Sequence, residues 1–171
     1  TGLVIAASRS GSGKTLVTLG LLAALAARGI KVMPAKAGPD YIDTAILARA
    51  AGSTAINLDP WAMSGARLGQ IAGRQAQGAD LLLVEGAVPG EGVMGLFDGA
   101  ADGRGSTGDL AAALGLPVVL VIDAERQSQS VAALAHGFAT WRPQVRVAGV
   151  ILNRVATTRH ERMLREALGP T

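Results

Sequence analysis

The sequence predicts a three-layer α/β fold, in which helices cover both faces of a mostly parallel β-sheet. Short, continuous apolar segments alternate along the chain with longer helical patterns, as in sheets built from right-handed crossovers. Apolar residues make up 49% of the 171 residues but aromatic residues only 3%, which favours helices packed on a buried sheet over an aromatic-rich β-sandwich.

The first elements are an apolar strand at 3–7, a polar loop at 8–15 and a helix at 14–28 that Gly29 ends. The further elements that we expect are a strand at 31–35, a loop at 36–43, a helix at 44–51, a turn at 57–61, a helix at 64–78, a strand at 81–84, a glycine-rich loop at 85–105, a helix at 106–114, a strand at 117–122, a helix at 128–139, a strand at 145–152 and a helix at 158–168. Ser106 and Asp109 have the spacing of a capping box at the start of their helix.

The loop at 8–15 reads Ser-Arg-Ser-Gly-Ser-Gly-Lys-Thr and matches a Walker A loop, except that Ser8 stands where the consensus has glycine. Glycines let backbone N–H groups approach phosphate oxygens, and the helix N-terminus adds partial positive charge. Lys14 can reach the outer phosphates, and the Thr15 hydroxyl can bind Mg²⁺. The strand and helix that flank the loop support a P-loop NTPase fold. The residues that we expect to bind the nucleotide here are Ser10, Gly11, Ser12, Gly13, Lys14 and Thr15.

Composition limits the class of protein. The net charge of +3 suits an anionic ligand, but no Lys/Arg stripe is present and few aromatic residues could stack on bases, so we expect no nucleic-acid partner. The longest apolar stretch, 16–27, is too short to span a bilayer, so we expect a cytoplasmic enzyme with no membrane partner. The absence of cysteine excludes disulfides and thiol nucleophiles within this chain. We expect residues 1–171 to be one domain, trimmed at both ends from a longer chain.

Polar residues gather where the predicted strands end, and ligands bind at that edge of a parallel sheet. Lys36, Asp40 and Asp43 follow the second strand. Aspartates are common in turns, which is the alternative for both. Beside the phosphate loop, a carboxylate could instead hold Mg²⁺ or a water on it, and Lys36 could neutralise phosphate charge, which is the reading that we favour.

Glu85 follows four apolar residues directly, and an acid at such a strand end commonly serves the metal in phosphate-loop proteins. Asp98 alone reads as a turn residue. Asp123, which also ends a strand, could belong to a nucleotide edge or cap the next segment, and the residues do not decide between these. Asn153 could pair with the donor and acceptor edge of adenine or simply cap a turn, and the residues do not decide between these. Tyr41 could contact a flat ligand or anchor its loop.

Several blocks together resemble the N-terminal synthetase domain of cobyrinate a,c-diamide synthases, including the hydrogenobyrinate enzymes. The resemblance covers essentially the whole chain, and the Gly-Pro-Asp-Tyr-Ile-Asp and Val-Met-Gly-Leu-Phe-Asp-Gly blocks are its most specific parts. The blocks lie at 9–15, 36–43, 57–61, 93–99 and 148–155.

The resemblance implies a dethiobiotin synthetase-like fold and amidation of the a and c acetate side chains of a corrin precursor in the cobalamin pathway. ATP and Mg²⁺ would activate each carboxylate as an acyl phosphate, and ammonia would displace the phosphate. The catalytic residues would be Lys14, Lys36, Asp40, Asp43, Glu85 and Asp98.

By the same resemblance, Thr15, Asp40 and Glu85 would surround Mg²⁺. Asn153 would read adenine, with Arg154 beside it. The residues toward the corrinoid substrate would be Tyr41, Ile42, Asp43 and Asp98.

In the family, ammonia comes from a C-terminal glutaminase domain with a catalytic cysteine. This chain has no cysteine, so we expect an isolated synthetase domain that uses free ammonia at best. A homodimer is left open. Residues 87–92 form an insertion relative to the family and contain a second Glu-Gly, so Glu91 competes with Glu85 as the functional acid. We favour Glu85 because it abuts the strand that would hold it.

Two alternatives remain. One is another enzyme of the superfamily, cobyric acid synthase or dethiobiotin synthetase, against which the Gly-Pro-Asp-Tyr-Ile-Asp block argues. The other is a partitioning-type ATPase switch, in which a lysine stands at the position of Arg9. Such switches usually carry a feature that binds membrane or DNA, and none is visible here.

Overall fold

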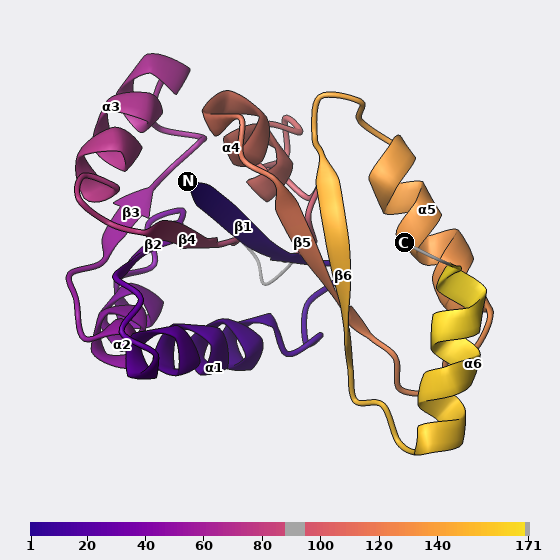
Figure 1. Ribbon diagram of the computed structural model, residues 1–171. Helices are drawn as coiled ribbons and strands as arrows, with labels where there is room; N and C mark the ends of the chain where they lie inside the picture. The colour runs from indigo at the N-terminus through magenta and orange to yellow at the C-terminus, as the bar shows by residue number, and fades with distance from the viewer. Residues whose placement is uncertain (88–94, 170–171) are drawn as a thin grey trace.

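The computed structural model describes residues 1–87 and 95–169, which form six strands and six helices in strict alternation (Figure 1). The strands are β1 (Gly2–Ala7), β2 (Val32–Ala37), β3 (Ile56–Leu58), β4 (Leu81–Glu85), β5 (Val118–Asp123) and β6 (Val147–Asn153). The helices are α1 (Lys14–Ala27), α2 (Tyr41–Ala51), α3 (Gly65–Gln75), α4 (Thr107–Leu114), α5 (Ser130–Thr140) and α6 (Thr158–Leu168).

The strands form one sheet in the order β3-β2-β4-β1-β5-β6, and every neighbouring pair is parallel. The predicted α/β class with a parallel sheet is therefore confirmed. Because the strands are parallel, all their carboxyl ends lie at one edge of the sheet, and the loops that leave β1, β2, β4, β5 and β6 meet there.

Helices cover both faces of the sheet, as the sequence predicted. Leu22 of α1 and Leu47 of α2 pack with Ile5, Leu83 and Val121 in a core on one face. The core on the other face contains side chains from α3, α4, α5 and α6. Because helices cover both faces of the sheet, the strand residues between them are mostly apolar, and their sequences read as continuous apolar runs.

Several expected boundaries were wrong. Residues 57 and 58 were expected in a turn but belong to β3, whose Asn57 is in register with Lys36 of β2. Such a short edge strand is defined by its partner, whereas the Asn-Leu-Asp-Pro sequence alone carries a turn signal.

The expected loop at 36–43 is also shorter than predicted. Lys36 lies within β2, and Tyr41 to Asp43 form the first turn of α2. The Asp40 side chain accepts hydrogen bonds from the N–H groups of Ile42 and Asp43, so the helix begins three residues earlier than we expected. Glu85 is likewise the last residue of β4 rather than the first residue of a loop.

In the part of the chain that the structure describes, no helix combines the length and the apolar character needed to cross a membrane.

Candidate active site

The phosphate loop joins β1 to α1 at the carboxyl edge of the sheet. Gly11 and Gly13 both have positive φ angles, 75° and 85°, which a side chain would strain. Gly13 is the N-cap of α1 and provides no side chain to cap it, so the first N–H groups of the helix remain available to a ligand. The backbone therefore has the form expected of an anion-binding loop.

Four charged side chains from four different segments converge below this loop. The Lys14 ammonium lies 2.8 Å from Glu85 Oε1 and also donates to the carbonyl of Gly86. Lys36 lies 3.4 Å from the same Glu85 oxygen and donates to Asp43 Oδ2 at 2.6 Å. The Thr15 hydroxyl donates to Glu85 Oε1 at 2.6 Å. The structure thus brings five of the predicted catalytic and metal-binding residues into one cluster.

The cluster is buried almost completely. Glu85 and Lys36 have no exposed surface and Lys14 only 5%, whereas Asp43 stands at the opening with 24% of its side chain exposed. Charged groups are rarely buried to this degree unless they are paired. The two lysines and the two carboxylates of the cluster balance one another in formal charge.

The surroundings shift the pKa values of two of these groups. Burial lowers the pKa of Lys14 below its ordinary value, with the charge of Lys36 acting in the same direction and Glu85 opposing both. For Asp43, partial burial favours the neutral carboxyl, but the hydrogen bond and charge of Lys36 prevail and hold its pKa below the ordinary value. Asp43 is therefore a carboxylate at neutral pH.

One oxygen of the cluster has no protein partner. Glu85 Oε2 is buried and accepts no hydrogen bond from any of the described residues. A buried carboxylate oxygen without a partner is costly, unless a ligand completes its contacts. The same carboxylate accepts from the Thr15 hydroxyl through its other oxygen, and this pair of groups fits Mg²⁺, which is usually held by one or two protein oxygens together with phosphates.

No group of three or more His, Cys, Asp or Glu side chains that could hold a metal occurs within residues 1–87 and 95–169. In that part of the chain, a metal ion would therefore not be held by three or more of these side chains. This finding is compatible with a Mg²⁺ ion that takes most of its ligands from phosphates and water.

We expected Asp40 to contact the metal, and in this structure its side chain caps helix α2. Its Oδ1 atom caps α2, at 2.9 Å from the N–H of Ile42 and 3.0 Å from that of Asp43. Asp40 thereby fixes the first turn of α2, which presents Asp43 to Lys36. The next two side chains, Tyr41 and Ile42, are 78% and 58% exposed and line no core.

Asp98 lies in a loop that packs on the end of β1, where the N–H of Leu96 donates to Ala7. Its Oδ2 atom accepts from the N–H of Gly95 at 2.8 Å, so its side chain shapes its own turn. Asp98 also lines an apolar hollow of about 320 Å³ together with residues of α5. Glu91, the alternative acid, lies with most of the insertion outside the described residues.

Asn153 and Arg154 leave the end of β6 toward the phosphate loop. The Asn153 amide donates to the carbonyl of Ser12 at 2.9 Å, so the predicted base-reading residue is in contact with the predicted phosphate-binding loop. Arg154 has a positive φ of 57° and donates to Asp123 Oδ2 at 2.8 Å.

Asp123, for which the sequence left two roles open, is almost fully buried at the end of β5 and accepts from Arg9 as well. It was singled out by the same signal as Glu85, an acid at the end of an apolar strand.

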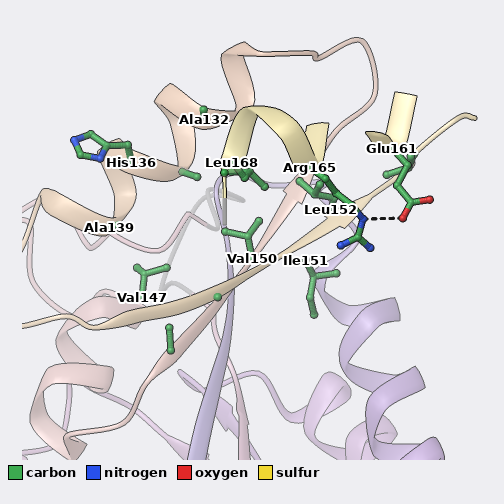
Figure 2. Close-up of a pocket in the computed structure, with 15 residues that line it drawn as sticks. Ala132, His136, Ala139, Val147, Val150, Ile151, Leu152, Glu161, Arg165 and Leu168 are labelled. Atoms are coloured by element: carbon green, nitrogen blue, oxygen red, sulfur yellow. Dashed lines mark hydrogen bonds and ion pairs between the residues drawn. The ribbon is translucent and has the colours of Figure 1, made fainter. Parts of the chain in front are cut away.

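A large groove lies elsewhere. It has a volume of about 850 Å³ and runs between β6, α5 and α6 (Figure 2). Its lining is mainly apolar, including Val150 and Leu152, with the Arg165–Glu161 ion pair at its rim. None of the predicted site residues lines it.

Comparison with solved structures defines the class of protein. Chloroplast FtsY from Physcomitrella patens aligns with a TM-score of 0.58 and 23% identity over 89% of this chain and 49% of that one. The 54 kDa signal recognition particle protein from Aeropyrum pernix, in complex with GDP, aligns with a TM-score of 0.60 and 22% identity over 92% of this chain and 36% of that one. At these identities the likeness establishes the fold, which is that of a P-loop NTPase.

Sequence comparison then gives the family. Residues 3–170 match the model of the CobQ/CobB/MinD/ParA nucleotide binding domain, and the chain belongs to that family. It is similar to hydrogenobyrinate a,c-diamide synthases from Brucella anthropi (56% identical over 169 residues, 99% of this chain), Rhizobium meliloti (57% over 167 residues, 98%) and Streptomyces coelicolor (54% over 169 residues, 97%).

These relatives confirm the resemblance drawn from the sequence blocks. The chain spans only 38% of the length of the first two relatives and 33% of the third.

Proposed function

We propose that this chain is the ATP-dependent synthetase domain of a hydrogenobyrinate or cobyrinate a,c-diamide synthase. The observation that carries the proposal is the buried cluster of Lys14, Lys36, Asp43 and Glu85 beneath a phosphate loop. The similarity to named synthases over nearly the whole chain supports the substrate class. In this proposal the whole protein forms amides on a corrinoid polycarboxylate, with a glutaminase domain as its source of ammonia.

The reaction that we propose has two steps. An acetate carboxylate oxygen of the corrinoid attacks the γ-phosphorus of ATP, forming an acyl phosphate and releasing ADP. Ammonia then attacks the carbonyl carbon, the phosphate leaves with the bonding electrons, and a proton is released to solvent. Neither step needs a protein nucleophile, so the protein contributes alignment and charge neutralisation.

The cluster has the groups for this task. Lys14 and Lys36 would neutralise charge on the transferred phosphoryl group. Thr15, Asp40 and Glu85 would hold Mg²⁺, which supplies further neutralisation of the phosphates when bound. Asp43 already restrains Lys36 at 2.6 Å and stands at the opening of the cluster, where the corrinoid carboxylate would arrive. Tyr41, Ile42 and Asp98 would contact the corrinoid around that opening.

Incubation with hydrogenobyrinate, Mg-ATP and ammonium tests the proposal. Mass spectrometry should show conversion of two carboxyl groups to amides, together with release of ADP and phosphate. No amide product from a folded protein that binds ATP would contradict the corrinoid assignment. ATP turnover that ignores the corrinoid but responds to DNA or lipid vesicles would favour a partitioning-type switch instead.

Two substitutions of Asp40 can separate its capping role from its proposed role in holding Mg²⁺. Asp40→Asn keeps an oxygen that can cap α2, because asparagine is as good an N-cap as aspartate, but it removes the charge. We expect Asp40→Asn to retain the melting temperature and to lose most Mg²⁺-dependent turnover. Asp40→Ala should lose both, with about 1 kcal/mol of stability lost through the cap. Wild-type turnover by Asp40→Asn across a Mg²⁺ titration would show that the residue acts only as a cap.

A further inference from the structure

Asp123 holds together the two loops between which a nucleotide base would lie. Its Oδ2 atom accepts hydrogen bonds from Arg9 of the phosphate loop and from Arg154 after β6, both at 2.8 Å. Its Oδ1 atom accepts from the N–H of Glu125 at 3.0 Å. The carboxylate is 3% exposed, whereas the Arg9 and Arg154 side chains are 63% and 48% exposed. The buried carboxylate therefore pairs with two guanidinium groups that are largely exposed.

A second connection joins the same two loops. The Asn153 amide nitrogen donates to the carbonyl of Ser12, and the Ser12 hydroxyl donates to the carbonyl of Arg9 at 2.8 Å. Together with the Asp123 ion pairs, these bonds close a ring through Arg9, Ser12, Asn153, Arg154 and Asp123. Gly13 packs tightly against this ring, because a Cβ there would overlap the Asn153 amide nitrogen.

The backbone at the end of β6 is also held beside Asp123. Asp123 and Asn153 are paired in the β5–β6 register, and the N–H of Ala124, directly after β5, donates to the Asn153 carbonyl at 2.9 Å. Arg154 then adopts a left-handed conformation that is unfavourable for a residue with a side chain and persists only where the surroundings hold it. The ion pair with Asp123 is such a restraint.

This ring fixes the direction of the Asn153 amide. One N–H is used on Ser12, which leaves one N–H donor and the carbonyl oxygen free. A donor beside an acceptor is complementary to N7 and the N6 amino group of adenine, whereas guanine presents acceptors at both positions. If the amide rotated, this discrimination would be weakened.

We propose that Asp123 is a positioning residue that sets nucleobase selectivity, by holding the Asn153–Arg154 turn against the phosphate loop. The inference rests on the proposed ATP-dependent function and on the expectation, drawn from the sequence, that Asn153 contacts the adenine base. It adds a residue outside the phosphate-binding cluster and a property, the preference for adenine over guanine, that amidation chemistry does not itself require.

Asp123→Asn tests the proposal, because asparagine keeps the Oδ1 acceptor for Glu125 but presents an N–H donor to the two guanidinium groups. We expect the preference for ATP over GTP, measured as the ratio of dissociation constants of fluorescent analogues, to fall about two- to tenfold, the range for one net hydrogen bond. In nucleotide-free protein, the Asn153 side-chain amide signals should shift in ¹H–¹⁵N spectra. Asp102→Asn, which removes an exposed partner of Arg104, is the matched control and should change neither readout.

A second comparison separates positioning from general stability. In an Arg9→Gln/Arg154→Gln background, Asp123→Asn should have no further effect on the ATP to GTP ratio, because the cations through which Asp123 acts are gone. If Asp123→Asn alone does not fold, the Arg9→Gln/Arg154→Gln protein carries the test, since both side chains are largely exposed.

An unchanged ratio with unmoved Asn153 signals would overturn the inference, as would an equal loss of affinity for both nucleotides. Absence of nucleotide binding by the wild-type chain would overturn this inference and the proposed function together. Altered selectivity in a protein that binds ATP but amidates no corrinoid would sustain the inference and refute the proposed substrate.

Discussion

The two charges with no exposed surface, Lys36 and Glu85, cannot be explained by stability alone. A buried ion pair rarely repays the cost of removing both charges from water, and a well-packed apolar pair of similar volume would serve the fold as well or better. Glu85 moreover leaves one buried oxygen without a partner among the described residues. Charges kept at such a cost, below a phosphate loop, indicate a site shaped for a charged ligand.

Asp43 gives a prediction at the scale of one residue. Its pKa in the folded protein lies below the ordinary aspartate value of about 3.9, which applies to the unfolded chain. At a pH between the folded-state and unfolded-state pKa values, the unfolded chain therefore binds more protons than the folded one. The stabilising contribution is therefore fully present above about pH 4 and is lost as the pH falls through the folded-state pKa. We expect the stability difference between wild type and Asp43→Asn, from urea unfolding between pH 3 and about pH 6, to shrink only below about pH 4.

The same residue can be followed directly. The Asp43 carboxyl carbon should titrate by NMR with a midpoint below about 3.9, and Lys36→Met should raise this midpoint because it removes the hydrogen bond and the charge. A midpoint at or above the ordinary value, or one that does not respond to Lys36→Met, would show that the Lys36 contact does not control this carboxyl.

At the scale of single elements, the helix starts explain much of the site geometry. Asp40 begins α2 and so places Asp43, in the first turn of that helix, in contact with Lys36. By contrast, α1 begins without a side-chain cap and leaves its N–H groups for phosphate. The α4 helix begins with a full capping box: the Ser106 hydroxyl accepts from the N–H of Asp109, and Asp109 accepts from the N–H of Ser106. This capping box was predicted from the spacing of two residues, and the structure confirms it.

Ser106→Ala should therefore cost about 1–2 kcal/mol of unfolding free energy, at the upper end for an N-cap because Ser106 is fully buried. The reference is Ser64→Ala at the start of α3, where the hydroxyl accepts one longer bond of 3.3 Å, and where we expect a loss of about 0.5 kcal/mol. Equilibrium urea unfolding of the two variants gives the comparison. An equal loss in both would mean that the burial and the shorter bond of the Ser106 hydroxyl add nothing to its cap.

At the scale of the whole molecule, the strand order decides which loops meet. With β1 between β4 and β5, the phosphate loop lies beside Glu85 on one side and Asp123 on the other. Lys36 comes from β2, whose register places it opposite Glu85. The cluster therefore combines residues 14, 36, 43 and 85 without any of them being close in sequence to all the others.

The 171-residue chain as a whole contains no thiol, and this gives a prediction about its nitrogen source. A glutaminase that works through a cysteine cannot reside in these residues, so ammonium should support amidation of hydrogenobyrinate and ammonia-free glutamine should not. Mass spectrometry of the corrinoid provides the measurement, and addition of ammonium to the glutamine reaction is the control for an active enzyme. Amidation with glutamine alone at the ammonium rate would contradict the prediction.

Much of this protein follows from the sequence by itself. Continuous apolar runs alternating with helical patterns predicted the parallel sheet, because strands covered on both faces contain few polar residues. The glycine-rich loop between a strand and a helix determined the phosphate site, because its chemistry is local. Glu85 could be selected because it follows directly on a buried strand.

Other features were decided only by the tertiary structure, because they depend on residues that are distant in the chain. The three-residue strand β3 exists through its pairing with β2, and its own sequence carries a turn signal. The Lys36 contact with Glu85 depends on strand register. The position of Asp123 between Arg9 and Arg154 depends on β5 lying between β1 and β6, and strand order is a property of packing that residue patterns do not encode.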